Sequence, residues 1–267
     1  MEKIKENLEN LEIKNDIKIL YAVEAGSRAW NLESEDSDFD IRFIYKQNDA
    51  KKYISLKPLK ETIDGFSEDR LYDWQGWDIK KAFHLLKSMN PSIVEWIYSP
   101  IVYNSDNEVN IREKAHELLK EQNRILPLLY HYISMAKSNY KKHIENNKNV
   151  KIKKYLYVIR PAGMVEWLLL NNKQADKLVE IDFKLVLNCI KVSLNETCYN
   201  DILKVIEKKK NVKELDEEPR LVAIDEWIED LFKKKFTKED LNDLDENIQF
   251  LDQYDKYLFS ILKVNHL

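Results

Sequence analysis

The chain has 267 residues, of which 44% are hydrophobic and 34% are charged, a composition that excludes an intrinsically disordered protein. The net charge of -4 and the pI near 5.9 create no overall basic field, so any contact with nucleic acid must come from a local patch. The sequence contains no apolar signal-peptide core and no apolar stretch long enough to span a membrane, and two cysteines are too few for a disulfide framework. We therefore expect a cytoplasmic protein with no membrane contact.

The chain opens with patterns typical of a helix and then a strand. Apolar residues recur at helical spacing in residues 2–15 and predict an amphipathic helix. Residues 17–23 are apolar and rich in strand formers, and Gly26 follows them at a point where the backbone can turn closely. We therefore predict a strand that feeds a tight glycine turn.

Two carboxylates follow this turn. Asp38 and Asp40 lie at the start of a second predicted strand, residues 39–45, and project from the same face because strand side chains alternate. Two close carboxylates raise each other's pKa, and the usual neutralising ligand is a hard divalent cation such as Mg²⁺, or Mn²⁺. Gly26 and Ser27 can offer a backbone N–H and a hydroxyl to the phosphates that such a cation carries. This pattern favours nucleoside triphosphate chemistry.

The next segments complete a first predicted domain. Residues 46–60 are polar and predict a loop or a short hairpin, whereas residues 61–74 have the aliphatic, aromatic and turn residues of a strand hairpin. Residues 79–87 place apolar side chains on one side and basic side chains on the other, which predicts a helix that covers the sheet. A short helix is predicted at residues 93–98. We expect the first domain to close near residue 105.

Long helical periods dominate the rest of the sequence, where Gly163 is the only glycine. We expect Pro161 to kink or interrupt the third helix of this region. The sequence therefore predicts two domains, residues 1–105 and an all-helical domain at residues 106–267. The predicted helices of the second domain span residues 110–121, 126–147, 150–171, 183–194, 200–210, 219–235 and 238–264.

A basic stretch lies within the second domain. Residues 137–160 contain eight lysines and arginines against one acid, with Tyr140, Tyr155 and Tyr157 interleaved. Cations attract phosphates and aromatic rings stack on bases, so the stretch fits a nucleotide or single-strand site that faces the glycine turn across a cleft. Two helices with solvated lysine faces would explain the same residues equally well.

The order of strand, Gly-Ser, ten-residue gap and Asp-x-Asp resembles the polymerase-β-type nucleotidyltransferases. Five separated blocks resemble, more narrowly, the predicted nucleotidyltransferases of the YcgL type, also called RNA-repair-ligase-associated, over most of the chain. One position departs from that family, because Asn31 stands where the family usually has glycine. Asparagine also tolerates a left-handed backbone, so we expect the turn to be kept. The five blocks are residues 26–30, 36–45, 76–82, 90–100 and 153–161.

This resemblance implies an α+β protein, with a nucleotidyltransferase-type mixed sheet and flanking helices followed by the all-helical domain. It also implies a third carboxylate on a later strand, for which Asp73 and Asp78 are the candidates. Asp73 is favoured because Asp78 stands where the helix at residues 79–87 would take its N-cap. The residues implied in nucleotide binding are Gly26, Ser27, Arg28, Lys154 and Arg160.

The predicted activity is metal-dependent transfer of a nucleoside monophosphate from a nucleoside triphosphate to an acceptor hydroxyl, with release of pyrophosphate. In the two-metal scheme that the resemblance implies, Asp38, Asp40 and Asp73 hold the metals. The association with RNA repair suggests an RNA 3′ end or a tRNA as acceptor. Two alternatives stay open: an antitoxin-type enzyme that adenylylates a protein, and an inactive nucleotide-binding module. The filled carboxylate positions disfavour the inactive module.

Overall fold

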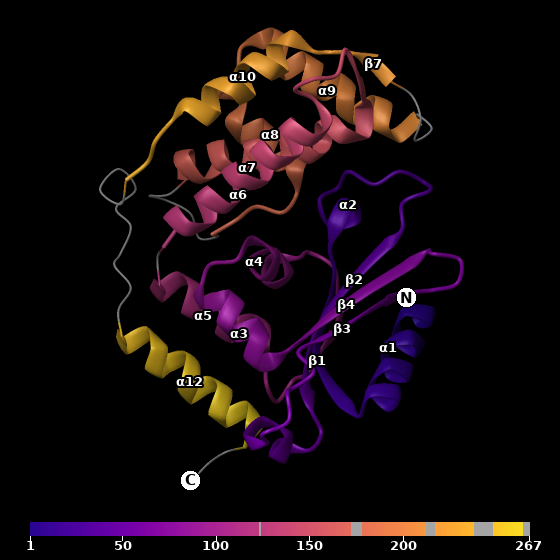
Figure 1. The fold of residues 1–267 in the computed structure, drawn as a ribbon, viewed down its shortest axis with the longest axis vertical. Coiled ribbons are helices and arrows are strands. Elements are labelled where there is room, and N and C mark those ends of the chain that lie inside the picture. The colour runs from indigo at the N-terminus through magenta and orange to yellow at the C-terminus, as the bar shows by residue number, and fades with distance from the viewer. Residues whose placement is uncertain (123, 172–177, 212–216, 238–247, 264–267) are drawn as a thin grey trace. The chain divides into compact units, whose positions relative to one another are not determined.

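The computed structural model describes residues 1–122, 124–171, 178–211, 217–237 and 248–263 (Figure 1). The chain divides into two compact units that are not two continuous halves. The first unit comprises residues 1–29, 38–123 and 245–267, and the second comprises residues 30–37 and 124–244. The predicted boundary at 105–106 lies inside the first unit, because the next helix, α5 (Ile111–Gln122), buries its apolar face there.

A five-stranded mixed sheet forms the centre of the first unit, within the residues described. Its order is β3-β4-β2-β1-β5, in which β2 and β4 run parallel while the other neighbours are antiparallel. This sheet with its flanking helices confirms the predicted α+β class. The strands are β1 (Ile17–Glu24), β2 (Phe39–Gln47), β3 (Thr62–Phe66), β4 (Tyr72–Asp78) and β5 (Val102–Ser105).

Helices cover both faces of this sheet (Figure 1). The predicted first helix, α1 (Glu2–Asn15), buries Ile4, Leu8 and Leu11 in a core that includes residues of β1 and β2. On the other face lie α3 (Ile79–Lys87) and α4 (Pro91–Tyr98). The remaining elements of this unit are a short helix α2 (Gly26–Ala29), the 3-10 turn η1 (Ala50–Ile54) in the predicted loop, and α12 (Ile248–Leu262).

Aromatic packing anchors the helices of that second face. Trp77, near the end of β4, stacks on Trp96 of α4 with ring centroids 4.0 Å apart. Phe83 of α3 packs against Tyr254 and Tyr257 of α12. Large aromatic side chains bury much apolar area in such pairs, so the tryptophan pair holds α4 to the sheet and the Phe83 contacts hold α12 to α3. The described part of the predicted helix at 238–264 therefore belongs to the first unit, whereas residues 238–247 lie outside the described residues.

The second unit is helical, as predicted, with one added two-stranded ribbon of β6 (Asn149–Lys151) and β7 (Glu217–Pro219). Its central helix, α7 (Ile152–Asn171), is buried at most positions from residue 152 to residue 168. No helix in the described ranges is long and apolar enough to cross a membrane. The helices of this unit are α6 (Leu126–His143), α7 (Ile152–Asn171), α8 (Phe183–Ile190) with the 3-10 turn η2 (Lys191–Ser193), α9 (Glu196–Asn211) and α10 (Val222–Lys233).

Pro161 lies inside α7, and the helix continues through it. The predicted interruption is therefore wrong, and the structure gives a physical reason. Proline lacks the N–H that would bond the carbonyl four residues earlier, which here belongs to Tyr157. The side-chain amide of Asn139 donates to that carbonyl at 3.1 Å, so the carbonyl keeps a partner.

Candidate active site

The glycine turn packs directly against one of the two predicted carboxylates. Gly26 has a φ of 60°, and a Cβ on this residue would lie 1.8 Å from Oδ2 of Asp40. The backbone N–H of Ala25 donates to the Asp40 carbonyl at 2.8 Å. A side chain at position 26 would both strain the backbone and collide with the carboxylate. Glycine is therefore required here by conformation and by space.

Strand pairing brings Asp73 next to Asp40. In the parallel β2–β4 ladder, Asp40 is the register partner of Asp73. The guanidinium of Arg42 lies between the two carboxylates, with Nη2 at 2.7 Å from Oδ1 of Asp40 and 2.8 Å from Oδ2 of Asp73. Burial raises the pKa of Asp40, and Arg42 opposes that rise while the charges of Asp38 and Asp73 add to it. The structure thus holds two carboxylates around one cation.

Asp38 immediately precedes β2 and is exposed. Its carbonyl oxygen accepts a hydrogen bond of 3.0 Å from Nε of Arg28, whose guanidinium also stacks over the ring of Phe39 at 4.0 Å from the centroid. Arg28 therefore ties the glycine turn to the start of β2. Its predicted contact with nucleotide stays a prediction, as does that of Ser27, which is partly exposed in the same turn.

Asp78 lies at the opposite end of β4 from Asp73. Its Oδ1 accepts the backbone N–H of Lys80 at 2.9 Å, which is the expected N-cap of α3, and its Oδ2 accepts the hydroxyl of Tyr53 at 2.8 Å. The residue is fully buried, and this burial raises its pKa. It follows Asp73 by five positions along the strand, a span of about 17 Å. The structure therefore brings Asp73, and not Asp78, to Asp40.

Glu24 is a residue of this site that the sequence analysis did not single out. It ends β1, is fully buried, and accepts the backbone N–H of Asp40 at 2.8 Å. The hydroxyl of Tyr103 donates to its other oxygen. Burial raises the pKa of Glu24 to about 7. In the sequence, Glu24 could have been recognised as an acidic residue at the end of a mostly apolar strand, shortly before the glycine turn.

Lys154 and Arg160 both lie on α7 in the second unit. Arg160 is buried and its guanidinium stacks on Trp30, with 3.9 Å to the ring centroid, while Lys154 lies over Tyr157 at 4.7 Å. Trp30 belongs to the same unit, since the chain enters that unit at residue 30 and leaves it after residue 37. Asn31 in this segment has a φ of 57°, which confirms the left-handed turn expected for it.

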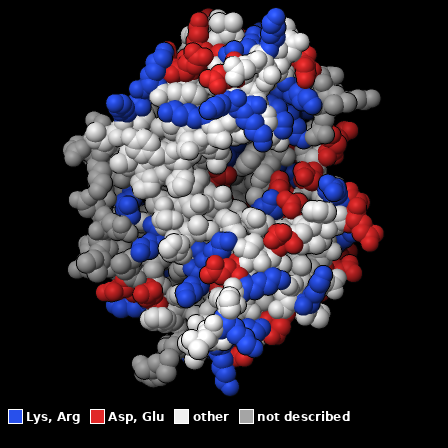
Figure 2. Space-filling view, in the orientation of Figure 1, with Lys and Arg blue, Asp and Glu red and all other residues white. Residues whose placement is uncertain are grey.

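The basic stretch of the second unit has fewer stacking rings than the sequence suggested. Tyr140 and Tyr155 are buried, and Tyr157 is the partly exposed member of the three. Figure 2 shows many lysine and arginine side chains on the face of this unit turned to the viewer. The roles of Lys154 and Arg160 in nucleotide binding stay predictions.

No group of three or more histidine, cysteine, aspartate or glutamate side chains is arranged to hold a metal ion among the residues described. The Asp40–Asp73 pair nevertheless offers a suitable donor set, because one cationic nitrogen already lies within 2.8 Å of an oxygen of each carboxylate. A hard divalent cation prefers such carboxylate oxygens. The donor chemistry therefore fits a divalent cation.

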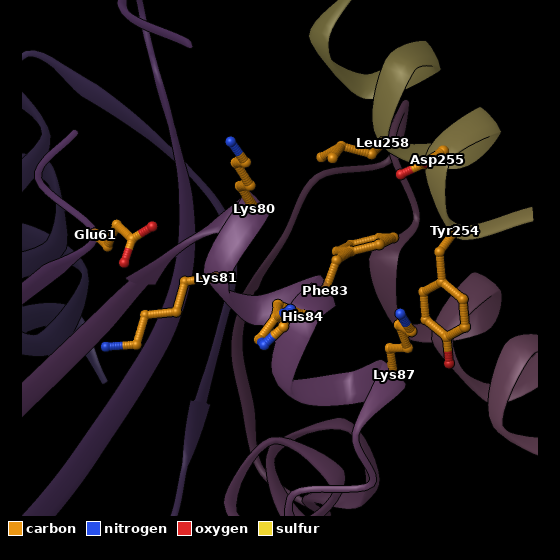
Figure 3. Close-up of a pocket in the computed structure, with 9 residues that line it drawn as sticks. All are labelled: Glu61, Lys80, Lys81, Phe83, His84, Lys87, Tyr254, Asp255 and Leu258. Atoms are coloured by element: carbon orange, nitrogen blue, oxygen red, sulfur yellow. The ribbon is translucent and has the colours of Figure 1, made fainter. Parts of the chain in front are cut away.

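A separate cavity of about 580 Å³ lies between α3 and α12 in the first unit (Figure 3). Its lining mixes cationic, acidic and apolar side chains, and Figure 3 shows the amines of Lys80, Lys81 and Lys87 lying apart from one another. Lys81 already donates to Thr62 at 2.7 Å. Because its polar groups do not converge on one point, this cavity lacks the usual feature of a specific ligand site.

The mixed sheet, the glycine turn and the facing carboxylates together define a polymerase-β-like nucleotidyltransferase fold. A model of the RNA repair pathway DNA polymerase beta family matches residues 1–257, and the chain belongs to this family. The chain is also similar to the uncharacterized protein YcgL of Bacillus subtilis (strain 168). The two are 34% identical over 228 residues, which cover 85% of this chain and 84% of that protein. The family indicates nucleotidyltransferase activity in general terms.

Proposed function

We propose that this protein transfers a nucleoside monophosphate from a nucleoside triphosphate to an acceptor hydroxyl. The observation that carries the proposal is the close approach of Gly26 to Asp40, with Asp73 in register beside it. A glycine in the turn leaves backbone N–H groups accessible to phosphate oxygens, and the paired carboxylates lie directly next to that turn. Membership of a polymerase beta family supports the same reaction class.

In the proposed reaction, the acceptor oxygen attacks the α-phosphorus in line with the leaving pyrophosphate. A new P–O bond forms as the bond between the α-phosphorus and the bridging oxygen breaks, and pyrophosphate leaves with that oxygen. Gly26 and Ser27 hold the β- and γ-phosphates, while Asp38 and Asp40 orient the triphosphate. Asp73 receives the proton of the acceptor hydroxyl. Asp38, Asp40 and Asp73 would hold Mg²⁺ or Mn²⁺, which would supply neutralising charge and lower the pKa of the hydroxyl.

Glu24 is placed to support Asp40 rather than to touch the substrate. Its carboxyl group accepts the N–H of Asp40, and Tyr103 fixes its other oxygen from the interior. This arrangement fixes the backbone that carries Asp40. A supporting group of this kind restricts the rotamers of the reacting side chain, which catalytic geometry requires.

For the acceptor we propose an RNA 3′ end, including that of tRNA. The support is the family to which the chain belongs, the RNA repair pathway DNA polymerase beta family. The exposed lysines of the second unit supply the kind of cationic surface that a polyphosphate backbone needs, in a chain whose net charge is -4.

The test is an acceptor screen with each of the four nucleoside triphosphates labelled at the α-phosphate, in Mg²⁺ or Mn²⁺. The acceptors are RNA with free 3′ hydroxyls, tRNA and purified cell protein. We expect label on RNA, release of pyrophosphate, and loss of both in Asp40→Asn. The matched control is Asp64→Asn, the same substitution at an exposed position of β3 in the same sheet.

The control variant should transfer label as the parent does. Label on protein alone would replace the RNA acceptor by a protein acceptor, as in an adenylylating antitoxin. Absence of label on every acceptor, from all four nucleotides, would contradict the proposal and leave the inactive nucleotide-binding module.

A further inference from the structure

We infer that Arg42 is a resident cation which competes with divalent metal for the Asp40–Asp73 pair, so that metal enters the pair together with a nucleoside triphosphate. This inference rests on the proposed function for the identity of the site. It adds an order of binding to that function. It also assigns Arg42 a positioning role, because the residue controls which partner the two carboxylates hold.

The contacts of Arg42 carry the first step of the argument. Arg42 follows Asp40 by two residues on β2, so both side chains project from the same face of the strand. One nitrogen, Nη2, donates to both carboxylates at 2.7 and 2.8 Å, and Nη1 donates to the carbonyls of Ile41 at 3.1 Å and Asp73 at 3.2 Å. Four acceptors therefore fix the guanidinium in one place.

Competition is the second step, and it follows from the shared oxygens. A divalent cation bridging Asp40 and Asp73 would take oxygen lone pairs that now accept from Nη2. The arginine side chain is only 16% exposed, and its guanidinium is a cation with five donors and no acceptor. A metal ion held by the pair and the guanidinium therefore compete for these oxygens and repel each other by charge.

The third step concerns what would move Arg42. A guanidinium binds phosphate in the same forked geometry as carboxylate, so a triphosphate held at the Gly26 turn offers Arg42 a substitute partner. The triphosphate also brings negative charge that offsets the charge of an incoming metal ion. The ligand class that this site accepts is accordingly a metal–nucleoside triphosphate complex, and the free metal ion binds weakly at the pair.

The experiment measures Mn²⁺ affinity by the paramagnetic resonance signal of the free ion, in protein without nucleotide. We expect Arg42→Gln to bind Mn²⁺ at least about tenfold more tightly than the parent, because one competing charge-assisted hydrogen-bond donor is lost. Adding Asp73→Asn to Arg42→Gln should cancel the gain. The matched control is Arg70→Gln in the β3–β4 turn, where the guanidinium stacks over Phe66 instead, and it should leave the affinity unchanged.

A second arm repeats the titration with an ATP analogue that cannot be hydrolysed at the α–β bond. The analogue should tighten Mn²⁺ binding more in the parent than in Arg42→Gln, since the variant has no resident cation to displace. Circular dichroism verifies the fold of each variant. Arg42→Lys serves if Arg42→Gln does not fold, because it keeps one positive charge without the fork and should show a smaller gain.

Equal Mn²⁺ affinity in the parent and in a folded Arg42 variant would overturn the inference and leave Arg42 as a clamp between β2 and β4. Because the measurement needs no turnover, it separates two failures. A parent protein that transfers no nucleotide but shows the Arg42 effect contradicts the proposed function alone. Active transfer without the effect contradicts the Arg42 inference alone.

Discussion

The two ends of β4 hold two aspartates whose surroundings differ sharply. Asp73 at the start of the strand is 42% exposed and shares the guanidinium of Arg42 with Asp40. Asp78 at the end is fully buried and is committed to the N–H of Lys80 and the hydroxyl of Tyr53. The carboxylate of Asp73 has lone pairs accessible to a ligand, whereas the carboxylate of Asp78 accepts hydrogen bonds that cap a helix. Residue type thus specifies the available chemistry, whereas position in the sheet specifies its use.

The largest expected effect separates these two ends by activity. Asp73→Asn should lower turnover by about 10²- to 10⁴-fold, the usual range for loss of a positioned proton acceptor, while the amide keeps the side-chain shape. Asp78→Asn should keep most of its turnover, because asparagine is nearly as good an N-cap as aspartate. Initial rates of nucleotide transfer measure both. An inactive Asp78→Asn beside an active Asp73→Asn would reverse our assignment of the third carboxylate.

A second prediction tests the close approach at the Asp40 end of the sheet. Gly26→Ala should lose most nucleotide transfer and about 1–2 kcal/mol of unfolding free energy, because alanine is strained at a φ of 60° and its Cβ displaces the Asp40 carboxylate. Gly26→Asn tolerates the backbone conformation but keeps the collision. Urea unfolding and transfer rates distinguish the two causes. Full turnover in both variants would show that the approach is unnecessary.

At the opposite end of β4, the expected effect is on stability. Asp78→Ala should lower the unfolding free energy by about 2–4 kcal/mol, since it removes the N-cap of α3 and leaves the partly buried hydroxyl of Tyr53 without its acceptor. Asp78→Asn should cost less. Tyr53→Phe is the matching control, because it removes the hydroxyl itself and should make Asp78→Ala less costly. Urea midpoints at constant m-value measure each step. A cost below about 0.5 kcal/mol for Asp78→Ala would contradict the structural role.

The smallest expected effect is the pH dependence caused by Glu24. Its folded-state pKa of about 7 lies above the ordinary value of 4.5, so the folded protein holds this proton more tightly than the unfolded chain. The resulting stability is fully present below about pH 4.5 and is lost as the pH rises to about 7, by about 1–3 kcal/mol.

Glu24→Gln cannot ionise and should lack this loss, so the stability difference between variant and parent should change over that pH window. Chemical unfolding at pH 5 and pH 8, without added divalent ions, measures the difference. The same pH dependence in the parent and in the variant would show that Glu24 is not the group responsible.

Several elements could be read directly from the sequence because their causes are local. The strand at 17–23, the amphipathic helix α1 and the N-cap of α3 depend on side-chain period and on capping chemistry within a few residues. Gly26 was recognisable because few residues other than glycine suit a left-handed turn. The segment from this glycine to Asp40 was enough to indicate nucleoside triphosphate chemistry, since it is one continuous piece of chain, whereas the reaction class came from the resemblance to a known family.

The tertiary structure decided everything that depends on distant partners. The position of Asp73, rather than Asp78, beside Asp40 follows from the parallel register of β2 and β4, between which η1 and β3 lie in the chain. Burial in the folded sheet raises the pKa of Glu24, and its hydrogen-bond partner Tyr103 comes from a strand almost eighty residues later. Register and burial are set by which surfaces meet, and no local pattern contains that information. The sequence by itself therefore determined which chemical groups are available, and the packing of the sheet determined that Arg42 holds two of them together.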